Sequence, residues 1–303
     1  MQRWRSHLLT TFSGRDDGRP VWVDALAEGE DAGYFGPGSA AWQVTGGIAT
    51  LVAGIRALLM QALHPGAMAG VHDHSRYRED PLGRLAGTIR WIVVVTFGSR
   101  EAARVESARV GRFHERVRGT YPAPDGSPVS YSAGDPELLR WVHLVFTDAF
   151  LGCERVWGRP IPGGADGYVR EWAIAGELVG VQDPPRSAAE LAAQIDGFRT
   201  RGELRADERV AEAVRFIRNP PLAPGMMPAY RVLFAGAVAS IPAPYRRMLG
   251  LRRIPGAILL TRLVLRLVAA ILGGQSTSEQ AARRRISRLG SPSGHDTPQR
   301  PAT

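Results

Sequence analysis

His114 is the residue whose surroundings say most about chemistry. On a predicted helix over 99–119, His114 belongs to a face whose residues follow one another at three- and four-residue spacing and are mostly small or apolar: Ser107, Val110, Val117 and Tyr121. A neutral imidazole that points into an apolar cavity is a typical axial ligand of haem iron. The spacing fits a hydrogen-bonded core histidine at least as well, so periodicity alone does not decide between the two interpretations.

Arg84 and Thr88 lie four residues apart in a predicted helix over 82–97, so their side chains share one face. A guanidinium and a hydroxyl on that face could bind a haem propionate or polarise bound oxygen. The alternative is a solvent-facing first turn, with Asp80 as the N-cap and Pro81 as the first helical residue.

Other ionisable side chains allow weaker hypotheses. His64 precedes Pro65 at the end of an apolar helix, where a histidine interacts favourably with the helix C-terminus. The run His72-Asp73-His74, together with His64, could form a metal site, but a solvated polar loop explains the run better. His143 is a second-choice haem ligand, placed on an amphipathic helix.

Cys153 is the single cysteine, which excludes an intramolecular disulfide and fits a reducing compartment. A buried free thiol is the default interpretation of this residue. The Gly-x-Gly stretches over 34–38 and 163–167 lack the strand–turn–helix context of a dinucleotide site. Catalytic triads, phosphate-binding loops and paired cysteine motifs find no support in the sequence.

Helical periodicity dominates the chain and period-two alternation is almost absent, which predicts an all-α fold. The apolar stretch over 40–63, with Arg56 as its only full charge, predicts a buried helix. Further predicted helices cover 82–97, 99–119, 135–156, 166–180, 187–201, 206–217 and 228–240. Polar loops are predicted over 66–83 and 120–134.

These elements divide the chain into four parts. We assign an N-terminal segment to 1–40, a single large helical domain to 41–245, a basic amphipathic helix to 246–274 and a disordered tail to 275–303. The N-terminus lacks the apolar run of a secretory signal. We therefore expect a cytoplasmic protein, membrane-associated if the segment 246–273 binds lipid.

The positive charge is confined to the C-terminal fifth of the chain. The net charge is +9, and every basic residue is arginine; residues 246–303 contain 11 arginines and two acidic residues, whereas residues 1–245 contain 27 of each. A neutral body argues against nucleic-acid binding. The aliphatic segment 255–274, with Arg262 and Arg266 on one face, fits an interfacial helix on an anionic membrane or a core helix whose arginines reach the surface.

The order of several motifs resembles the MpaB-type oxygenases, a family that includes the latex-clearing rubber oxygenases. The resemblance runs from about Leu58 to Ala149, continues more weakly to about residue 240, and no single motif in it is diagnostic. The motifs are Leu63-His64-Pro65, Asp80-Pro81-Leu82-Gly83-Arg84-Leu85-Ala86-Gly87-Thr88, Phe97-Gly98, His114-Glu115-Arg116-Val117-Arg118-Gly119, Tyr131-Ser132-Ala133-Gly134-Asp135-Pro136 and Trp141-Val142-His143.

This resemblance implies an all-helical fold with a globin-related core that binds haem b without a covalent link. It implies that His114 is the proximal iron ligand and that Arg84 and Thr88 lie at the haem site. The latex-clearing enzymes carry a lysine directly before that threonine, whereas this chain has Gly87 there and no lysine at all. A lysine therefore cannot occupy the distal position, and rubber cleavage is in doubt.

We expect a haem-dependent oxygenase that uses molecular oxygen on a hydrophobic substrate, such as an isoprenoid or another alkene-containing small molecule. Arg84 and Thr88 would hold the haem and orient a distal water. Two alternatives stay open. One is a non-catalytic peripheral membrane protein that binds lipid or haem. The other is a metal-dependent hydrolase built on His64, His72 and Asp73.

Overall fold

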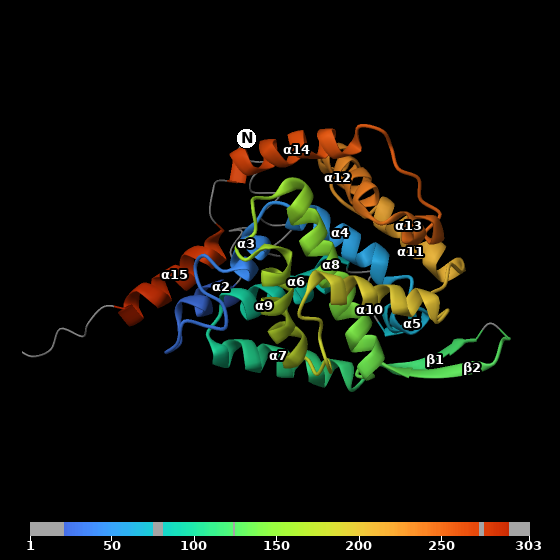
Figure 1. Cartoon of the computed structure of the whole chain (residues 1–303), viewed down its shortest axis with the longest axis horizontal. Helices are drawn as coiled ribbons and strands as arrows, with labels where there is room; N and C mark the ends of the chain where they lie inside the picture. The colour runs from blue at the N-terminus through green and yellow to red at the C-terminus, as the bar shows by residue number, and fades with distance from the viewer. Residues whose placement is uncertain (1–20, 75–80, 124, 273–275, 291–303) are drawn as a thin grey trace, which may run out of the picture.

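The computed structural model describes residues 21–74, 81–123, 125–272 and 276–290, without the side chains of 21, 81–85 and 224. Within these ranges the chain is helical apart from its loops and one short antiparallel hairpin (Figure 1), which confirms the predicted all-α fold. One continuous hydrophobic core joins both ends of the described chain, from Val23 to Ala282. The implied relation to globins stays a prediction.

The centre of the fold is the pairing of α8 (Pro136–Trp157) with α4 (Thr50–Gln61). Arg56 of α4 is buried and forms an ion pair with Asp148 of α8. The glycine at position 152 leaves the space that the Arg56 guanidinium fills. Because a buried charge is costly unless it is paired, this contact fixes how the two helices lie against each other.

The apolar stretch over 40–63 forms two helices, not the single one predicted. The helices α3 (Ala40–Gly46) and α4 enclose an angle of 91° around Gly47. A side chain at Gly47 would lie within 3.0 Å of the buried Glu154 carboxylate. The chain therefore bends where glycine allows close approach to α8, and hydrophobic periodicity, which continues through the bend, does not reveal the break.

The predicted polar loop over 66–83 is wrong for most of its length, because α5 (Pro65–His74) begins directly after His64. Proline is tolerated in the first turn of a helix, where its missing N–H costs nothing. The small residue Gly66 packs tightly against Leu138 and Tyr121, so close packing stabilises a helix of weak intrinsic propensity. The predicted Asp80 N-cap lies outside the described residues.

The next two helices, α6 (Pro81–Phe97) and α7 (Arg100–His114), form an antiparallel pair joined at Gly98 and Ser99. Ser99 caps α7, since its Oγ accepts a hydrogen bond from the Ala102 N–H at 3.2 Å. A side chain at Gly98 would lie 2.5 Å from the Val94 carbonyl oxygen. Only glycine fits this tight turn without moving the backbone.

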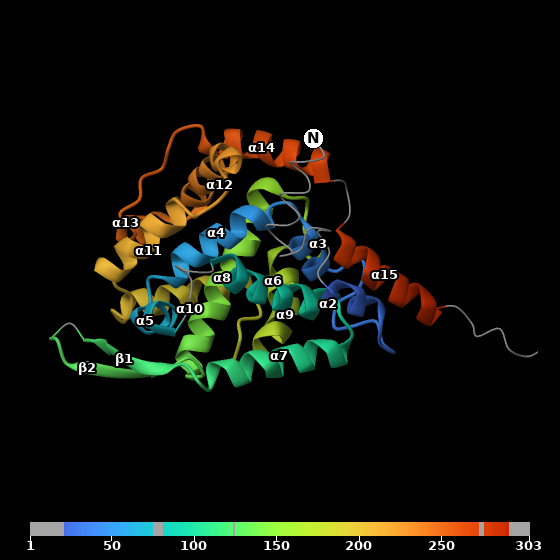
Figure 2. The ribbon, with the colours of Figure 1, turned by 180° about the vertical axis from the view of Figure 1, so that it is seen from behind.

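The predicted helix over 99–119 ends early, at His114, and the predicted loop over 120–134 is a β hairpin. Strand β1 (Arg118–Pro122) pairs antiparallel with β2 (Pro128–Ser132), with Thr120 opposite Ser130. A Cβ at position 119 would lie about 3 Å from the Tyr131 ring, so glycine there lets the ring pack against the strand. The β hairpin and the last described helix, Thr277–Gly290, lie at opposite ends of the molecule (Figure 2).

The predicted helices between 135 and 240 are close to the observed ones, whereas the single helix predicted over 246–274 is wrong, because residues 249–256 form a turn and loop that separate α13 from α14. Helices α9 and α10 pack on α8, and α12 packs on α4 and on α14, which runs along the outer edge of the molecule (Figure 1). The bounds are α9 (Gly164–Leu178), α10 (Ala188–Thr200), α11 (Glu208–Arg218), α12 (Met227–Ser240), α13 (Ala243–Met248) and α14 (Ala257–Leu272). A short 3-10 helix (Pro224–Met226) precedes α12.

The predicted disordered tail is wrong for α15 (Thr277–Gly290), which packs on α2 (Val21–Asp24) and the 3-10 turn Ala25–Ala27. Its Arg285 is fully buried. The guanidinium donates hydrogen bonds to the carbonyls of Leu26 (2.5 Å), Asp31 (3.0 Å), Ala32 (3.4 Å) and Phe97 (2.8 Å). The remainder of the predicted tail, 291–303, lies outside the described residues.

Among the described residues, no single helix is long and apolar enough to cross a membrane. Two bent pairs have the length and composition: α3 with α4, and α14 with α15 at 56°.

We predict that Arg285→Ala lowers the free energy of unfolding by about 3 kcal/mol, because the variant leaves several buried carbonyl groups without donors. Urea unfolding followed by circular dichroism measures the change. The matched control is the neighbouring exposed Arg284→Ala, which should change stability by less than about 0.5 kcal/mol. Equal effects of the two substitutions would contradict the role given to Arg285.

Candidate functional site

The residues predicted for the haem site lie on the two helices of the α6–α7 pair. The helices contact each other through a 3.0 Å hydrogen bond from the Trp91 indole N–H to the Ser107 hydroxyl. Arg84 precedes the turn at Gly98 by 14 residues, and His114 follows it by 16. Since both helices rise about 1.5 Å per residue, the backbones of Arg84 and His114 lie at the same open end of the pair.

His114 is the last residue of α7 and is half-buried. Burial lowers the pKa of its imidazole below the usual value, because desolvation penalises the charged ring. The imidazole is therefore neutral at pH 7, and a neutral ring carries the lone pair that a metal ion binds. Thr88 on α6 is also half-buried, whereas the Arg84 side chain lies outside the described residues.

Two glycines leave space beside these residues. Gly87 lies one helical turn from Trp91, and Gly111 lies one turn from Ser107, both toward the open end of the pair. Among the described residues, a Cβ at either position would meet no atom within 4 Å. Gly87 lies next to Thr88, and Gly111 lies three residues from His114. Gly87 is also the position at which the latex-clearing enzymes have lysine.

A buried carboxylate joins α7 to α6, and the sequence did not reveal this contact. Glu106 of α7 forms ion pairs with Arg90 of α6 at 3.0 Å and with Arg109 at 2.6 Å. A carboxylate paired with two guanidinium groups resists separation of the helices more than an exposed pair would. The three-residue spacing of Glu106 and Arg109 was the available signal, but the partner on α6 required the fold.

His64 and His143 are buried more deeply than His114. Desolvation lowers the pKa of each to about 4. Among the described residues, one ring nitrogen of each, Nδ1 of His64 and Nε2 of His143, has no hydrogen-bond partner. His64 lies against Trp141 and Phe198, with ring centroids 6.1 and 5.9 Å away. It is neutral at pH 7, so the predicted charge–dipole interaction at the helix end is wrong.

The His143 ring occupies the space that a side chain at Gly176 of α9 would need. A Cβ at Gly176 of α9 would lie 2.9 Å from the His143 ring. The α9 backbone at Gly176 therefore packs directly on the imidazole and keeps large ligands away from it. Cys153, also on α8, is buried, and burial raises the pKa of its thiol to about 11. A protonated thiol does not serve as a thiolate ligand.

The run His72-Asp73-His74 ends α5, and its side chains contact α11 and the β hairpin as well as one another. His72 Nδ1 lies 2.9 Å from Asp73, and His74 Nε2 lies 2.8 Å from the Arg118 carbonyl oxygen. Within the described part of the chain, no group of three or more His, Cys, Asp or Glu side chains is placed to hold a metal ion. This arrangement does not favour the hydrolase hypothesis.

Comparison with protein families gives the class. The family described as ER-bound oxygenase mpaB/B'/Rubber oxygenase, catalytic domain, matches residues 42–271, from α3 into α14. The chain belongs to this family and carries its oxygenase catalytic domain. Searches of curated proteins and of solved structures found no match.

We predict a measurable stability change from the buried histidines. The unfolded chain binds a proton at His143 near pH 6.5 and the folded chain only near pH 4, so stability falls as pH drops below 6.5. Between pH 7 and pH 5 the wild type should therefore lose about 2 kcal/mol more of its free energy of unfolding than His143→Leu loses. Urea unfolding at both pH values measures this. His74→Leu, at an exposed histidine, is the control; an unchanged pH dependence in His143→Leu would refute the assignment.

Proposed function

We propose that this chain is a haem-dependent oxygenase with His114 as the axial iron ligand. The observation that carries the proposal is a neutral, half-buried imidazole at the open end of the α6–α7 pair, beside the gap at Gly87 and Gly111. Membership of an oxygenase family supports the reaction class. The cofactor, haem b, comes from the resemblance in the motifs around Arg84, Thr88 and His114.

The residues present fit this cofactor. His114 offers a lone pair from a ring that is already desolvated, so binding iron does not first require loss of a proton. The open space around Gly87 and around Gly111 would leave room for a planar group between or beside the helices. When bound, haem would supply the oxygen chemistry, which no side chain of the protein provides.

Arg84 and Thr88 would act by position and hydrogen bonding. The Arg84 backbone lies at the level of His114, where a guanidinium could pair with a propionate carboxylate. The Thr88 hydroxyl, one residue from Gly87, would donate to or accept from a molecule in the gap. With glycine at position 87, no side chain extends from that position, so water, oxygen or substrate has access.

The substrate in this proposal is a hydrophobic alkene, such as an isoprenoid. Oxygenase chemistry needs a bond that oxygen can attack, and an apolar alkene suits the aliphatic residues of α6. The alternative is a lipid- or haem-binding protein without turnover. It receives support from the exposed apolar surface described below, and oxygen consumption distinguishes it from the enzyme.

We predict that the wild-type protein binds haemin with a Soret band and that His114→Ala lowers haemin affinity at least tenfold and shifts the band. Gly111→Leu should also lower affinity at least tenfold, because leucine fills the gap. The matched control is Gly54→Leu, at another helical glycine with open space around its Cβ. Spectrophotometric titration with haemin measures all four proteins.

The same preparations separate enzyme from binder. Haem-loaded wild-type protein should consume oxygen with squalene, a polyalkene, and not with its saturated analogue squalane. Haemin affinity that is equal in the wild type, His114→Ala and Gly111→Leu would sink the proposed site. A wild type that binds haemin through His114 but consumes no oxygen with alkenes would favour the non-catalytic alternative.

A further inference from the structure

The outer face of α14 is apolar and uncovered. Four of its leucines are between 50% and 69% exposed, far more than large apolar residues usually are in a packed helix: Leu259, Leu260, Leu263 and Leu267. The opposite face of the helix is also apolar and is buried; it consists of Ala257, Thr261, Leu265 and Val268. One helix thus carries two apolar faces, of which the fold covers one.

Polar contacts hold α14 in this orientation. The Thr261 hydroxyl donates to the Val232 carbonyl of α12 at 3.0 Å, and the Trp157 indole N–H donates to the Ile258 carbonyl at 3.1 Å. Gly236 of α12 leaves the space that Thr261 fills. Rotating the helix to bury its leucines would break these contacts, so the leucine face is fixed on the outside.

Arginines lie on α14 beside the leucine face and precede the helix in the chain, and the same segment contains no acidic residue. No Asp or Glu occurs between residues 246 and 278. Arg247, Arg252, Arg253 and Arg266 are exposed, and Arg262 donates to the Val156 carbonyl at 2.9 Å. On the helix, positions 262 and 266 lie on the flank between the buried face and the leucine face.

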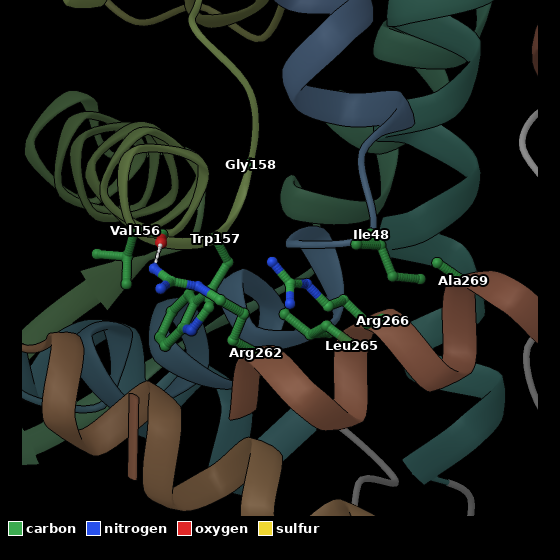
Figure 3. Close-up of a pocket in the computed structure, with 8 residues that line it drawn as sticks. All are labelled: Ile48, Val156, Trp157, Gly158, Arg262, Leu265, Arg266 and Ala269. Atoms are coloured by element: carbon green, nitrogen blue, oxygen red, sulfur yellow. Dashed lines mark hydrogen bonds between the residues drawn. The ribbon is translucent and has the colours of Figure 1, made fainter. Parts of the chain in front are cut away.

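A cavity of about 260 Å³ opens on that flank, between α14 and the C-terminal end of α8 (Figure 3). Arg262 and Arg266 line it beside Trp157 and Gly158, and both guanidinium groups point toward it in the figure. None of the lining residues belongs to α6 or α7. Two guanidinium groups at the edge of an apolar surface match the phosphate layer above an acyl-chain layer.

We propose that α14 lies in the surface of an anionic phospholipid membrane. The four leucines enter the acyl-chain region, and the bordering arginines bind headgroup phosphates, with Arg262 and Arg266 at the cavity. At 16 residues the helix is about 24 Å long, which suits a helix parallel to the surface. The proposal does not depend on haem.

A second copy of the chain is the competing occupant of this face. Two leucine faces packed together would bring the arginines of both copies close to one another, and the segment 246–278 that carries them supplies no acidic residue to pair with them. Like charges in such an interface oppose association, whereas an anionic membrane neutralises the same arginines. Charge complementarity therefore favours the lipid surface.

The test is flotation of the full chain with vesicles of phosphatidylcholine alone or with about 30% phosphatidylglycerol. Wild-type protein should float with the anionic vesicles. The double variant L263S/L267S should lower the partition coefficient at least tenfold, because both leucines leave the acyl-chain region. The matched control V105S/L289S changes two exposed apolar residues on α7 and α15 and should bind as the wild type does.

A second variant tests the charge. Replacing Arg252 and Arg253 by glutamine should weaken binding to anionic vesicles by about fivefold per arginine and leave the weaker binding to neutral vesicles unchanged. Wild-type protein that does not float, or L263S/L267S that floats equally well, would overturn the proposal. So would a wild type that is dimeric without lipid and becomes monomeric only in L263S/L267S, as measured by light scattering.

Discussion

The turn between Phe97 and Arg100 joins four parts of the chain, and the candidate site depends on it. Gly98 passes so close to the Val94 carbonyl that no side chain fits there. The Arg100 N–H donates to Asp31 of the N-terminal segment at 2.9 Å, and Arg285 of α15 donates to the Phe97 carbonyl. These contacts fix the direction in which α7 leaves the turn. A tilt of about 5° there would move His114, at the far end of the 15-residue α7, by about 2 Å.

Three histidines in this fold are neutral, and accessibility separates them. Aromatic rings enclose His64, and Gly176 closes over His143, so neither offers its lone pair to a large ligand. His114 is less buried and lies at the end of a helix pair, beside two glycines that leave space. Desolvation leaves all three rings with a free lone pair, and we propose that His114 is the one of the three that a planar cofactor can reach.

The membrane face that we propose lies on the opposite side of the molecule from α7 (Figures 1 and 2). A substrate dissolved in the bilayer therefore would not pass directly from α14 to His114. On this account α14 determines where the protein resides, and the α6–α7 pair determines what it does. The two properties can be lost independently, so a variant that does not bind lipid can still load haem.

The sequence predicted the helical class and the helix-borne positions of Arg84, Thr88 and His114, because hydrophobic periodicity and capping residues report on local structure. It missed the bend at Gly47, since apolar residues continue through it. It missed α15, because the buried Arg285 finds its partners in carbonyls some 190 to 260 residues away in sequence. The gap at Gly87 and Gly111 could not be predicted either, because it depends on the register of two helices.

The most direct test of the central claim replaces His114 by glycine and restores the ligand from solution. The variant should bind haemin weakly in buffer, and added imidazole should recover the wild-type Soret band, since free imidazole can enter the space that the side chain vacates. His143→Gly, treated in the same way, is the control and should not depend on imidazole. If His114→Gly binds haemin with a wild-type spectrum in buffer alone, or if imidazole restores nothing, His114 is not the iron ligand.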